Sequence, residues 1–292
     1  MVLAITLLVT ATRVEGVEWY VNNVKGDDAR DGRSEEVSGS SGPFRTIARA
    51  LRAAEAGDRI LLANTGKPYQ ESITLQGGSH SGTRSSPFAL IGNGAVLDGR
   101  KPVPAGAWEF YEGHVFRFRP ERMAFQVLYL DDTPATRVDA DPTRETLPPL
   151  QPRQWCLWRG HIYFCVEPRH LPSDYDLFYG GETVGITLYE VRHVVVMDLT
   201  VRGFQLDGIN AHDGARDVIL AGVTSRGNGR SGFSVGGASR VMLWQCVGTE
   251  NGAAQLRMEG YSRTTIKQCR FDPGPGVATV REDHAVMESP GP

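Results

Sequence analysis

The C-terminal third of the chain repeats itself about every 23 residues. Four residues that favour strands recur at intervals of 24, 23 and 23: Val194, Val218, Val241 and Thr264. A second apolar set recurs at intervals of 23, 24 and 23: Ile186, Ile209, Phe233 and Leu256. The step from each valine to the next member of the second set is constant, from 194 to 209, from 218 to 233 and from 241 to 256, so the two sets share one register. A fixed period of this size indicates the stacked repeats of a solenoid, which we assign to residues 184–271.

Composition places the chain among ordinary globular proteins. The 292 residues carry a formal net charge of −3 and contain no run of Lys or Arg, so nucleic acid is not favoured as a partner. Within residues 184–271, ten basic residues face seven acidic ones, and nine of the ten are Arg. This excess fits an anionic ligand gripped by Arg or, more simply, a mixed solvated surface.

The first residues resemble a secretory signal peptide. The apolar run from Val2 to Val9 is too short to span a bilayer, and small residues follow it near Ala11. No basic residue precedes Arg13, so the usual basic start is missing, and a first strand is the alternative. We predict a signal peptide over residues 1–16, no membrane span, and a secreted, periplasmic or cell-envelope location.

Residues 17–99 are predicted to cap the solenoid and form its first turns. An amphipathic stripe predicts a helix over Phe44–Ala56, which Gly57 ends. Short strands are expected after it, over Arg59–Ala63, Ser72–Leu75, Phe88–Ile91 and Ala95–Leu97. A helix in this place would cover the open apolar end that the first turn of a solenoid exposes.

Several strings carry a family resemblance: WYVNN, GPFRTIARAL, AGDRILL, YQESITL and SSPFALIGNGAVLDG. They resemble the opening of right-handed parallel β-helix repeat proteins, the pectate-lyase-like superfamily, over about residues 19–99 and again over 184–271. The resemblance implies an all-β fold, a right-handed single-stranded parallel β-helix with an N-terminal capping α-helix. It also implies a polysaccharide or other glycan as partner. The superfamily includes lyases, glycosidases, epimerases and proteins of no known activity.

Residues 100–183 interrupt the repeat and are rich in aromatic residues and proline. Their strand-like stretches predict an inserted β-rich subdomain. Its aromatic side chains either form its own core or stack on sugar rings. Residues 272–292 have no strong repeat and are assigned as a C-terminal tail.

Four cysteines form two sequence pairs. Cys156 and Cys165 flank a hairpin turn; a four-residue loop would align them for a disulfide, whereas a two-residue loop would not. Cys246 and Cys269 are one repeat apart and so share a column of adjacent repeats. They either form a disulfide or fill the interior as small apolar residues.

The repeat predicts which residues face outward from one strand of each turn. Because strand residues alternate between faces, two outward columns follow: Thr187, Asn210, Ser234 and Arg257; and Tyr189, His212, Gly236 and Glu259. A further turn, counted as one residue longer than the turn before it, would add Arg281 and Asp283. His212 and Glu259 would then lie about 10 Å apart across Gly236, leaving a notch that could hold one sugar. The simpler alternative is that outward residues of a solenoid are polar in any case.

Three functions compete for this notch. A lyase or epimerase acting on uronic-acid polymers needs a base, a proton donor and a cation, for which we assign His212, Tyr189 and Arg257. A glycoside hydrolase needs two carboxyl groups, and Glu259 would pair with Asp213 or Asp283. A non-catalytic glycan-binding or envelope module needs only the fold. The remaining substrate contacts are predicted from Asn210, Asp213, Arg230, Ser234 and Gly236.

No cofactor is evident in the sequence. Calcium is common in the resembling families, but no compact cluster of outward Asp or Glu is found for it. Asp27, Asp28 and Asp31 superficially resemble a calcium loop. Ala29 stands where a third ligand is needed, which excludes an EF-hand and leaves only a looser oxygen site.

Overall fold

The computed structural model describes residues 16–121, 125–141 and 143–289, so the predicted signal peptide lies almost wholly outside the described residues. The chain winds into a parallel β-helix, and the predicted all-β fold class is confirmed. One face of the coil, the first sheet, consists of six parallel strands: β3 (Ile73–Gln76), β14 (Ile186–Tyr189), β16 (Asp207–His212), β19 (Ser231–Val235), β22 (Ala254–Met258) and β25 (Val277–Arg281).

The other faces form the second sheet, also parallel. Its main path is β1 (Glu18–Val21), β2 (Arg59–Leu62), β4 (Phe88–Asp98), β15 (Arg192–Arg202), β17 (Arg216–Ala221), β20 (Arg240–Trp244), β23 (Arg263–Lys267) and β26 (Val286–Glu288). A shorter path adds β18 (Thr224–Arg226), β21 (Val247–Thr249) and β24 (Arg270–Phe271). The long strand β15 pairs with β17 along its first half and with β18 along its second half, so it bends around a corner of the coil.

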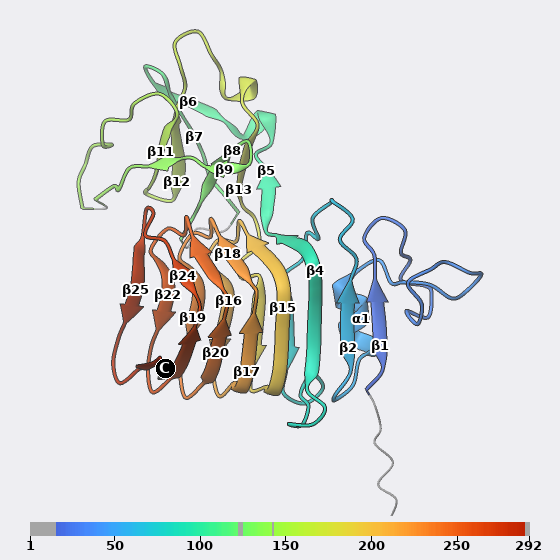
Figure 1. Ribbon diagram of the computed structural model, residues 1–292. Coiled ribbons are helices and arrows are strands. Elements are labelled where there is room, and N and C mark those ends of the chain that lie inside the picture. Colours follow the sequence, from blue (N-terminus) through green and yellow to red (C-terminus); the bar gives the residue numbers. More distant parts are fainter. Residues whose placement is uncertain (1–15, 122–124, 142, 290–292) are drawn as a thin grey trace, which may run out of the picture.

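The predicted register of the repeat is confirmed by the strand pairing. Val194 pairs with Val218, Val218 with Val241, and Val241 with Thr264. The second set, from Ile186 to Leu256, is likewise in register. Both sets extend toward the N-terminus, because Ile73 pairs with Ile186 and Phe88 with Val194. The turns on either side of residues 100–183 therefore stack directly on each other, as Figure 1 shows.

A column of left-handed residues ends each strand of the first sheet from β14 onward. Their φ angles lie between 54° and 66°: Glu190, Asp213, Gly237, Gly260 and Asp283. Glycine adopts this conformation without strain, and Asp tolerates it better than most residues. Asp213, a predicted substrate contact, therefore belongs to the turn rather than to the outward columns.

The last turn is one residue shorter than we predicted. Arg257 pairs with Val280, and Met258 pairs with Arg281. The residues that extend the two outward columns are therefore Val280 and Glu282, and the prediction of Arg281 and Asp283 was wrong. Residues 277–288 of the predicted tail form this further turn through β25 and β26.

The predicted helix is present but shorter than its amphipathic pattern. α1 (Ile47–Ala53) begins after Thr46, whose hydroxyl accepts a hydrogen bond from the Arg49 N–H, and ends because Ala54 is extended. The carboxylate of Glu71 accepts hydrogen bonds from the first two helical N–H groups. The helix packs on β1, β2 and β3, so it covers the N-terminal end of the coil as expected.

Residues 100–180 leave the coil after β4 and form two small sheets, which we call the insert. One is the five-stranded sheet of β10 (Thr136–Arg137), β11 (Gln154–Trp158), β12 (His161–Cys165), β7 (Val115–Phe118) and β6 (Glu109–Glu112). The other contains β5 (Arg100–Pro102), β13 (Leu177–Gly180), β8 (Leu128–Leu130) and β9 (Thr133–Pro134). Two 3-10 turns complete it, η1 (Ala105–Ala107) and η2 (Pro172–Asp174). Figure 1 shows the insert standing above the coil, over the ends of β4, β15 and β18.

Most aromatic residues of the insert form its own core, the first of the two alternatives. Phe118, Trp155 and Phe164 pack in one cluster, and Trp158 packs on Tyr163 in a second. The hairpin between β11 and β12 has a two-residue turn, in which Trp158 pairs with His161. Cys156 consequently faces Tyr163 rather than Cys165, and both cysteines are free.

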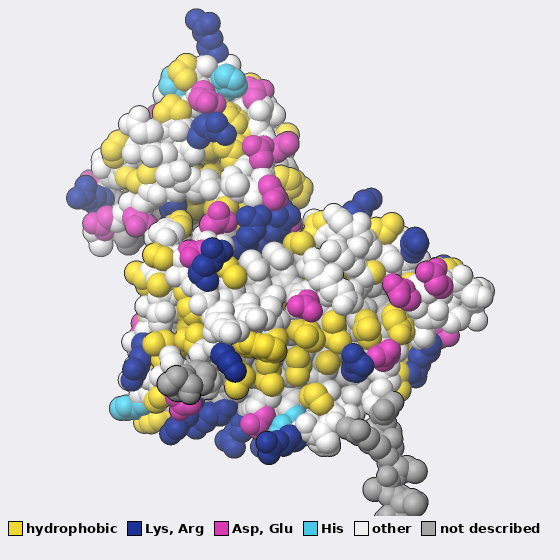
Figure 2. All heavy atoms as spheres, viewed as in Figure 1, with side chains coloured by type: hydrophobic (Ala, Val, Ile, Leu, Met, Phe, Trp, Pro, Cys, Tyr) yellow, Lys and Arg dark blue, Asp and Glu magenta, His cyan; other side chains and the backbone are white. Residues whose placement is uncertain are grey.

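The outward face of the second sheet is apolar along part of its length. Figure 2 shows a band of hydrophobic side chains across the coil. Met242 and Trp244 of β20 in this sheet are 38% and 41% exposed. Among the described residues, no helix is long and apolar enough to cross a membrane.

Candidate functional site

The outward face of the first sheet carries the predicted columns in the predicted register. Thr187 pairs with Asn210, Asn210 with Ser234, and Ser234 with Arg257. In the second column, Tyr189 pairs with His212. Gly236 and Glu259 continue this column just past their strands, since their N–H groups bond to the preceding turn at Ala211 and Val235.

The notch expected at Gly236 is filled by His212. A Cβ added to Gly236 would lie 2.2 Å from Cε1 of His212, so the imidazole lies flat against the glycine. Nε2 of His212 lies 3.2 Å from Oγ of Ser234, within hydrogen-bonding distance. The expected space for one sugar between His212 and Glu259 is therefore taken by the ring, and the prediction of an open notch was wrong. The glycine is needed here because a side chain would displace the imidazole.

Arg257 joins two carboxylates of adjacent turns. Its Nε donates to Oε1 of Glu259, and its Nη2 lies 2.8 Å from Oε2 of Glu282. The side chain of Glu259 is 24% exposed and that of Glu282 is 49% exposed. Contact with one guanidinium brings the two carboxylates close together. The site thus contains a carboxylate pair, a feature that the sequence had not revealed.

A second ion pair lies at the start of these strands. Nε and Nη2 of Arg230 lie 3.0 and 2.5 Å from the two carboxylate oxygens of Asp207, which is completely buried. Nδ2 of Asn210 also donates to this carboxylate, over 3.1 Å. The hydrogen bonds to Asp207 raise the pKa of Arg230 despite its burial, and Glu259 and Glu282 act in the same direction. The two ion-pair clusters are therefore close enough to influence each other electrostatically.

The insert contributes one aromatic side chain to this region. The guanidinium carbon of Arg230 lies 5.9 Å from the ring centre of Phe125, within the range of a cation–π contact. Phe125 is 44% exposed, as is Tyr189 at the other end of the face. We call the residues from Phe125 to Glu282 on this surface the polar face; its members are Phe125, Tyr189, Asp207, Asn210, His212, Arg230, Ser234, Gly236, Arg257, Glu259 and Glu282.

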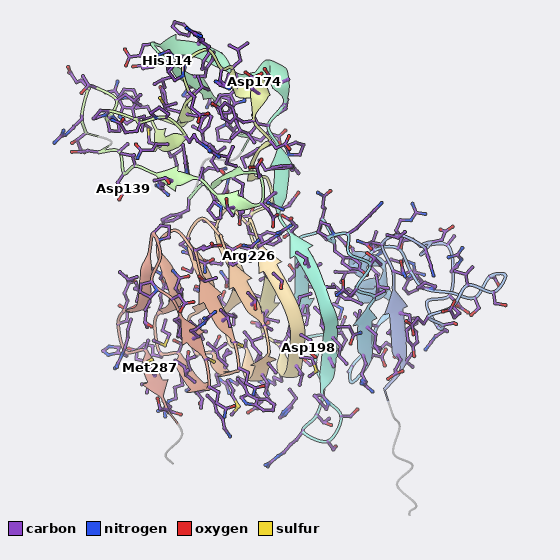
Figure 3. The ribbon with its side chains drawn as sticks, turned by 45° about the horizontal axis from the view of Figure 1, so that its top comes forward. His114, Asp139, Asp174, Asp198, Arg226 and Met287 are labelled. Carbon is purple, nitrogen blue, oxygen red and sulfur yellow. The ribbon has the colours of Figure 1, made fainter. Side chains whose placement is uncertain are left out.

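A separate charged cluster fastens the insert to the coil. Asp132 of the insert lies 2.7 Å from Arg202 and 3.2 Å from Arg226, and Glu250 lies 3.3 Å from Arg226. Burial alone would raise the pKa of Asp132, but Arg202 and Arg100 outweigh it and lower that pKa. Figure 3 shows Arg226 at the junction between the two parts. Arg202 and Arg226 pair on adjacent turns, and Asp132 and Glu250 neutralise these stacked arginines.

An open groove of about 810 Å³ lies on the other side of the coil, over the second sheet. Asp217 and Glu288 are the carboxylates that line it. They belong to turns three strand spacings apart along β17, β20, β23 and β26, which corresponds to about 14 Å. This separation is too large for paired carboxylate chemistry, so the groove is a weaker candidate than the polar face.

The described residues do not fit a metal site. No group of three or more His, Cys, Asp or Glu among them is arranged to hold an ion. The three aspartates of the Asp-rich loop bind its backbone instead: Asp27 accepts from Ala29, Asp28 from Arg45 and Thr46, and Asp31 from Arg33 and Gly42. These hydrogen bonds stabilise the loop, and a looser oxygen site there stays a prediction.

Three members of the polar face were not predicted from the sequence: Glu282, Asp207 and Phe125. Glu282 was missed because we counted one residue too many in the last turn, and the correct count places it after Glu259. Asp207 and Arg230 are one repeat apart and of opposite charge, a signal that could have paired them. Phe125 reaches the face only through the path of the insert, which no local pattern encodes.

Comparison with solved structures finds similar folds at low sequence identity. A glycoside hydrolase is 10% identical, with a TM-score of 0.55, over 86% of this chain and 74% of that one. A complex of XylC with xylose is 12% identical, with a TM-score of 0.46, over 94% and 70%. Pectate lyase Pel9A is 11% identical, with a TM-score of 0.34, over 94% and 78%.

No protein-family model and no curated protein sequence matches the chain. At these identities, structural likeness reports on the fold. The strand pairing and the structural likeness to the glycoside hydrolase together show that the chain has the fold of a parallel β-helix repeat protein.

Proposed function

We propose that the protein binds a glycan on the polar face and hydrolyses a glycosidic bond there, outside the cytoplasm. The observation that carries this proposal is the pair of carboxylates, Glu259 and Glu282, held on adjacent turns by Arg257. The fold-level likeness to a glycoside hydrolase supports the same class of substrate. Fold alone does not imply function, and the side chains of the polar face supply the chemistry.

Hydrolysis of a glycosidic bond uses two carboxyl groups on either side of the bond. A separation of about 5–5.5 Å is typical of retaining enzymes, in which one group attacks the anomeric carbon and the other transfers protons. We assign Glu259 and Glu282 to this class as a proposal, because contact with one guanidinium keeps the two carboxylates close together. Glu259 is the less exposed of the two, and we assign it as the nucleophile. Glu282 is the more exposed of the two, and we assign it as the general acid and base.

The charge of the polar face favours a neutral glycan. Three carboxylates, Asp207, Glu259 and Glu282, accompany two guanidinium groups, those of Arg230 and Arg257. A negatively charged polymer would meet a net negative surface. The exposed rings of Phe125 and Tyr189 offer flat apolar surfaces for further sugar units.

A lyase or epimerase of uronic-acid polymers is the second candidate. The direct pairing of Tyr189 with His212 favours it, since a base and a proton donor would stand on adjacent turns. The neutralising cation is the weak point, because a substrate carboxylate would have to displace Glu259 or Glu282 from Arg257. A non-catalytic glycan-binding module uses the same face without turnover.

The test is a screen of soluble neutral oligosaccharides and uronic-acid polymers. Release of reducing ends reports hydrolysis, absorbance of unsaturated products reports lysis, and NMR of the sugar ring protons reports epimerisation. We expect release of reducing ends, with at least about 100-fold loss in Glu259→Gln and in Glu282→Gln. Glu288→Gln is the matched control, because Glu288 lies in the same turn on another face. It should keep full activity.

Each alternative has its own outcome. Unsaturated or epimerised products that disappear in His212→Ala would replace hydrolysis by the lyase or epimerase mechanism. Saturable binding, measured by calorimetry, without any product would replace both by a binding module. Equal activity in Glu288→Gln and Glu259→Gln would refute the assignment of the carboxylate pair. Melting temperatures of all variants separate loss of activity from loss of fold.

A further inference from the structure

Two cysteines are stacked on adjacent turns at one corner of the coil. Cys246 follows β20 and Cys269 follows β23, and their neighbours are paired: Trp244 with Lys267 and Val247 with Arg270. Residues paired in this way have Cα atoms about 4.8 Å apart. That separation lies inside the range of about 4.4–6.8 Å seen in disulfides. Both thiols are free in the structure.

The two cysteines differ in environment. Cys246 is completely buried, whereas Cys269 is partly exposed. The backbone N–H of Cys246 donates to Sγ of Cys269 over 3.4 Å. The Cys246 thiol lies within hydrogen-bonding reach of Cys269 and lowers the pKa of Cys269 to about 6, while the same contact and burial raise the pKa of Cys246. The lowered pKa favours the thiolate form at Cys269, the more accessible of the two sulfurs.

We propose that Cys246 and Cys269 are a redox-active dithiol that forms a reversible disulfide between adjacent turns. The inference rests on the adjacent-turn positions of the two cysteines, on their difference in burial and on the closeness of their sulfur atoms. It is independent of the proposed glycan chemistry. Low-molecular-weight disulfides, or the disulfide of a thiol oxidoreductase, are the oxidants. Accessibility makes Cys269 the attacking sulfur and Cys246 the resolving one.

The exchange proceeds in two steps that balance. The thiolate of Cys269 attacks one sulfur of the oxidant, forming a mixed disulfide and releasing one thiolate. The thiol of Cys246 then loses its proton and attacks Sγ of Cys269, which releases the second thiol of the oxidant. Two electrons pass from the protein to the oxidant, and the products are one internal disulfide and two small thiols.

The disulfide would enclose the turn that carries part of the polar face. Arg257 and Glu259 lie in the segment between Cys246 and Cys269. The cross-link reduces the conformational entropy of the unfolded chain within this loop. Oxidation therefore stabilises the turn that bears Arg257 and Glu259, and reduction releases it.

The cysteines of the insert provide an internal control. Cys156 pairs with Tyr163 and Cys165 with Val115, so they do not face each other. Burial raises the pKa of both thiols, that of Cys156 to about 12. Neither thiol has a stacked partner of its own kind in this sheet, and we expect both to remain reduced under conditions that oxidise the coil pair.

The experiment treats the reduced full chain with oxidised glutathione, followed by alkylation of free thiols, digestion with trypsin and mass spectrometry without reductant. The expected product links the peptide 241–257 to the peptide 268–270 and has lost two hydrogen atoms. Cys246→Ser should stop at a glutathione adduct on Cys269. Cys269→Ser should leave Cys246 unmodified. Oxidised wild type should melt about 6–12 °C above the reduced form, and neither serine variant should show this shift.

Three results would overturn the proposal. One is a wild type that carries only separate glutathione adducts or none. Another is reaction of Cys156 or Cys165 at the same rate as Cys269. The third is an equal adduct on Cys246 in Cys269→Ser, which would contradict the assigned order of attack. Circular dichroism of both serine variants before oxidation verifies that each is folded.

Discussion

Replacing Arg230 by methionine would test how strongly the polar face depends on its buried ion pair. Asp207 is completely buried and accepts hydrogen bonds from Nε and Nη2 of Arg230 and from Nδ2 of Asn210. Methionine keeps the length of the side chain but removes both donors and the charge. Asp207 would then be left as a buried carboxylate with one amide partner.

The expected loss of stability is large for one surface-facing residue. Removal of one partner of a buried ion pair costs about 3–5 kcal/mol, because the other charge is left uncompensated. For a chain of this size, each kcal/mol lowers the melting temperature by about 2–4 °C, so Arg230→Met should melt about 6–20 °C lower. The double variant Asp207→Asn with Arg230→Met removes the charge as well and should recover most of the loss.

Thermal unfolding followed by circular dichroism measures these differences. Arg263→Met is the matched control, because Arg263 lies 3.5 Å from Glu288 and both side chains are about half exposed, at 55% and 47%. An exposed pair contributes about 0–1 kcal/mol. Equal shifts in Arg230→Met and Arg263→Met would refute the argument from burial. A double variant no more stable than Arg230→Met would show that the buried charge is not the cause.

Three further changes probe other parts of the coil. Asn251→Ala removes a buried amide that accepts two hydrogen bonds from Asn228, and should cost about 2–4 kcal/mol in urea unfolding. Gly236→Ala should cost about 1–2 kcal/mol by displacing His212, and a double-mutant cycle with His212→Ala should remove that cost. Burial raises the pKa of Glu71, so Glu71 favours folding below its unfolded pKa and this contribution is lost as pH rises. Urea unfolding of Glu71→Gln from pH 4 to 8 should therefore show wild type losing stability relative to the variant as pH increases; the opposite trend would contradict the raised pKa.

The architecture of the coil could be predicted because its rule is local and repeated. The near-constant spacing of the two apolar sets placed Val194 beside Val218 and Ile209 beside Phe233 without knowledge of any other part. Each turn meets only its neighbours, so the register propagates. The error in the last turn came from the same local rule, because a count that is wrong by one residue exchanges Glu282 for Asp283 on the outward face.

The candidate site could be predicted only in outline. Alternation placed His212 and Glu259 in one column but could not give the rotamer that lays the imidazole across Gly236. Sequence also could not reveal that Arg257 binds two carboxylates, since this depends on side chains reaching across turns. The contribution of Phe125 depends on how the insert folds back, which involves contacts distant in sequence.

The column of left-handed residues at the ends of the first-sheet strands has a consequence for the evolution of such a chain. This column repeats one backbone conformation at the same place in successive turns, as at Asp213, Gly237 and Gly260. A single turn is therefore an exchangeable module, and gain or loss of one would lengthen or shorten the coil without disturbing the faces. Asp132 and Tyr129 of the insert contact Arg226 and Gly227 of the coil. Turns could therefore be gained or lost without disturbing the insert only beyond those two residues. The polar face includes turns on both sides of that limit, so it could acquire or lose an outer carboxylate when a single turn is inserted or deleted.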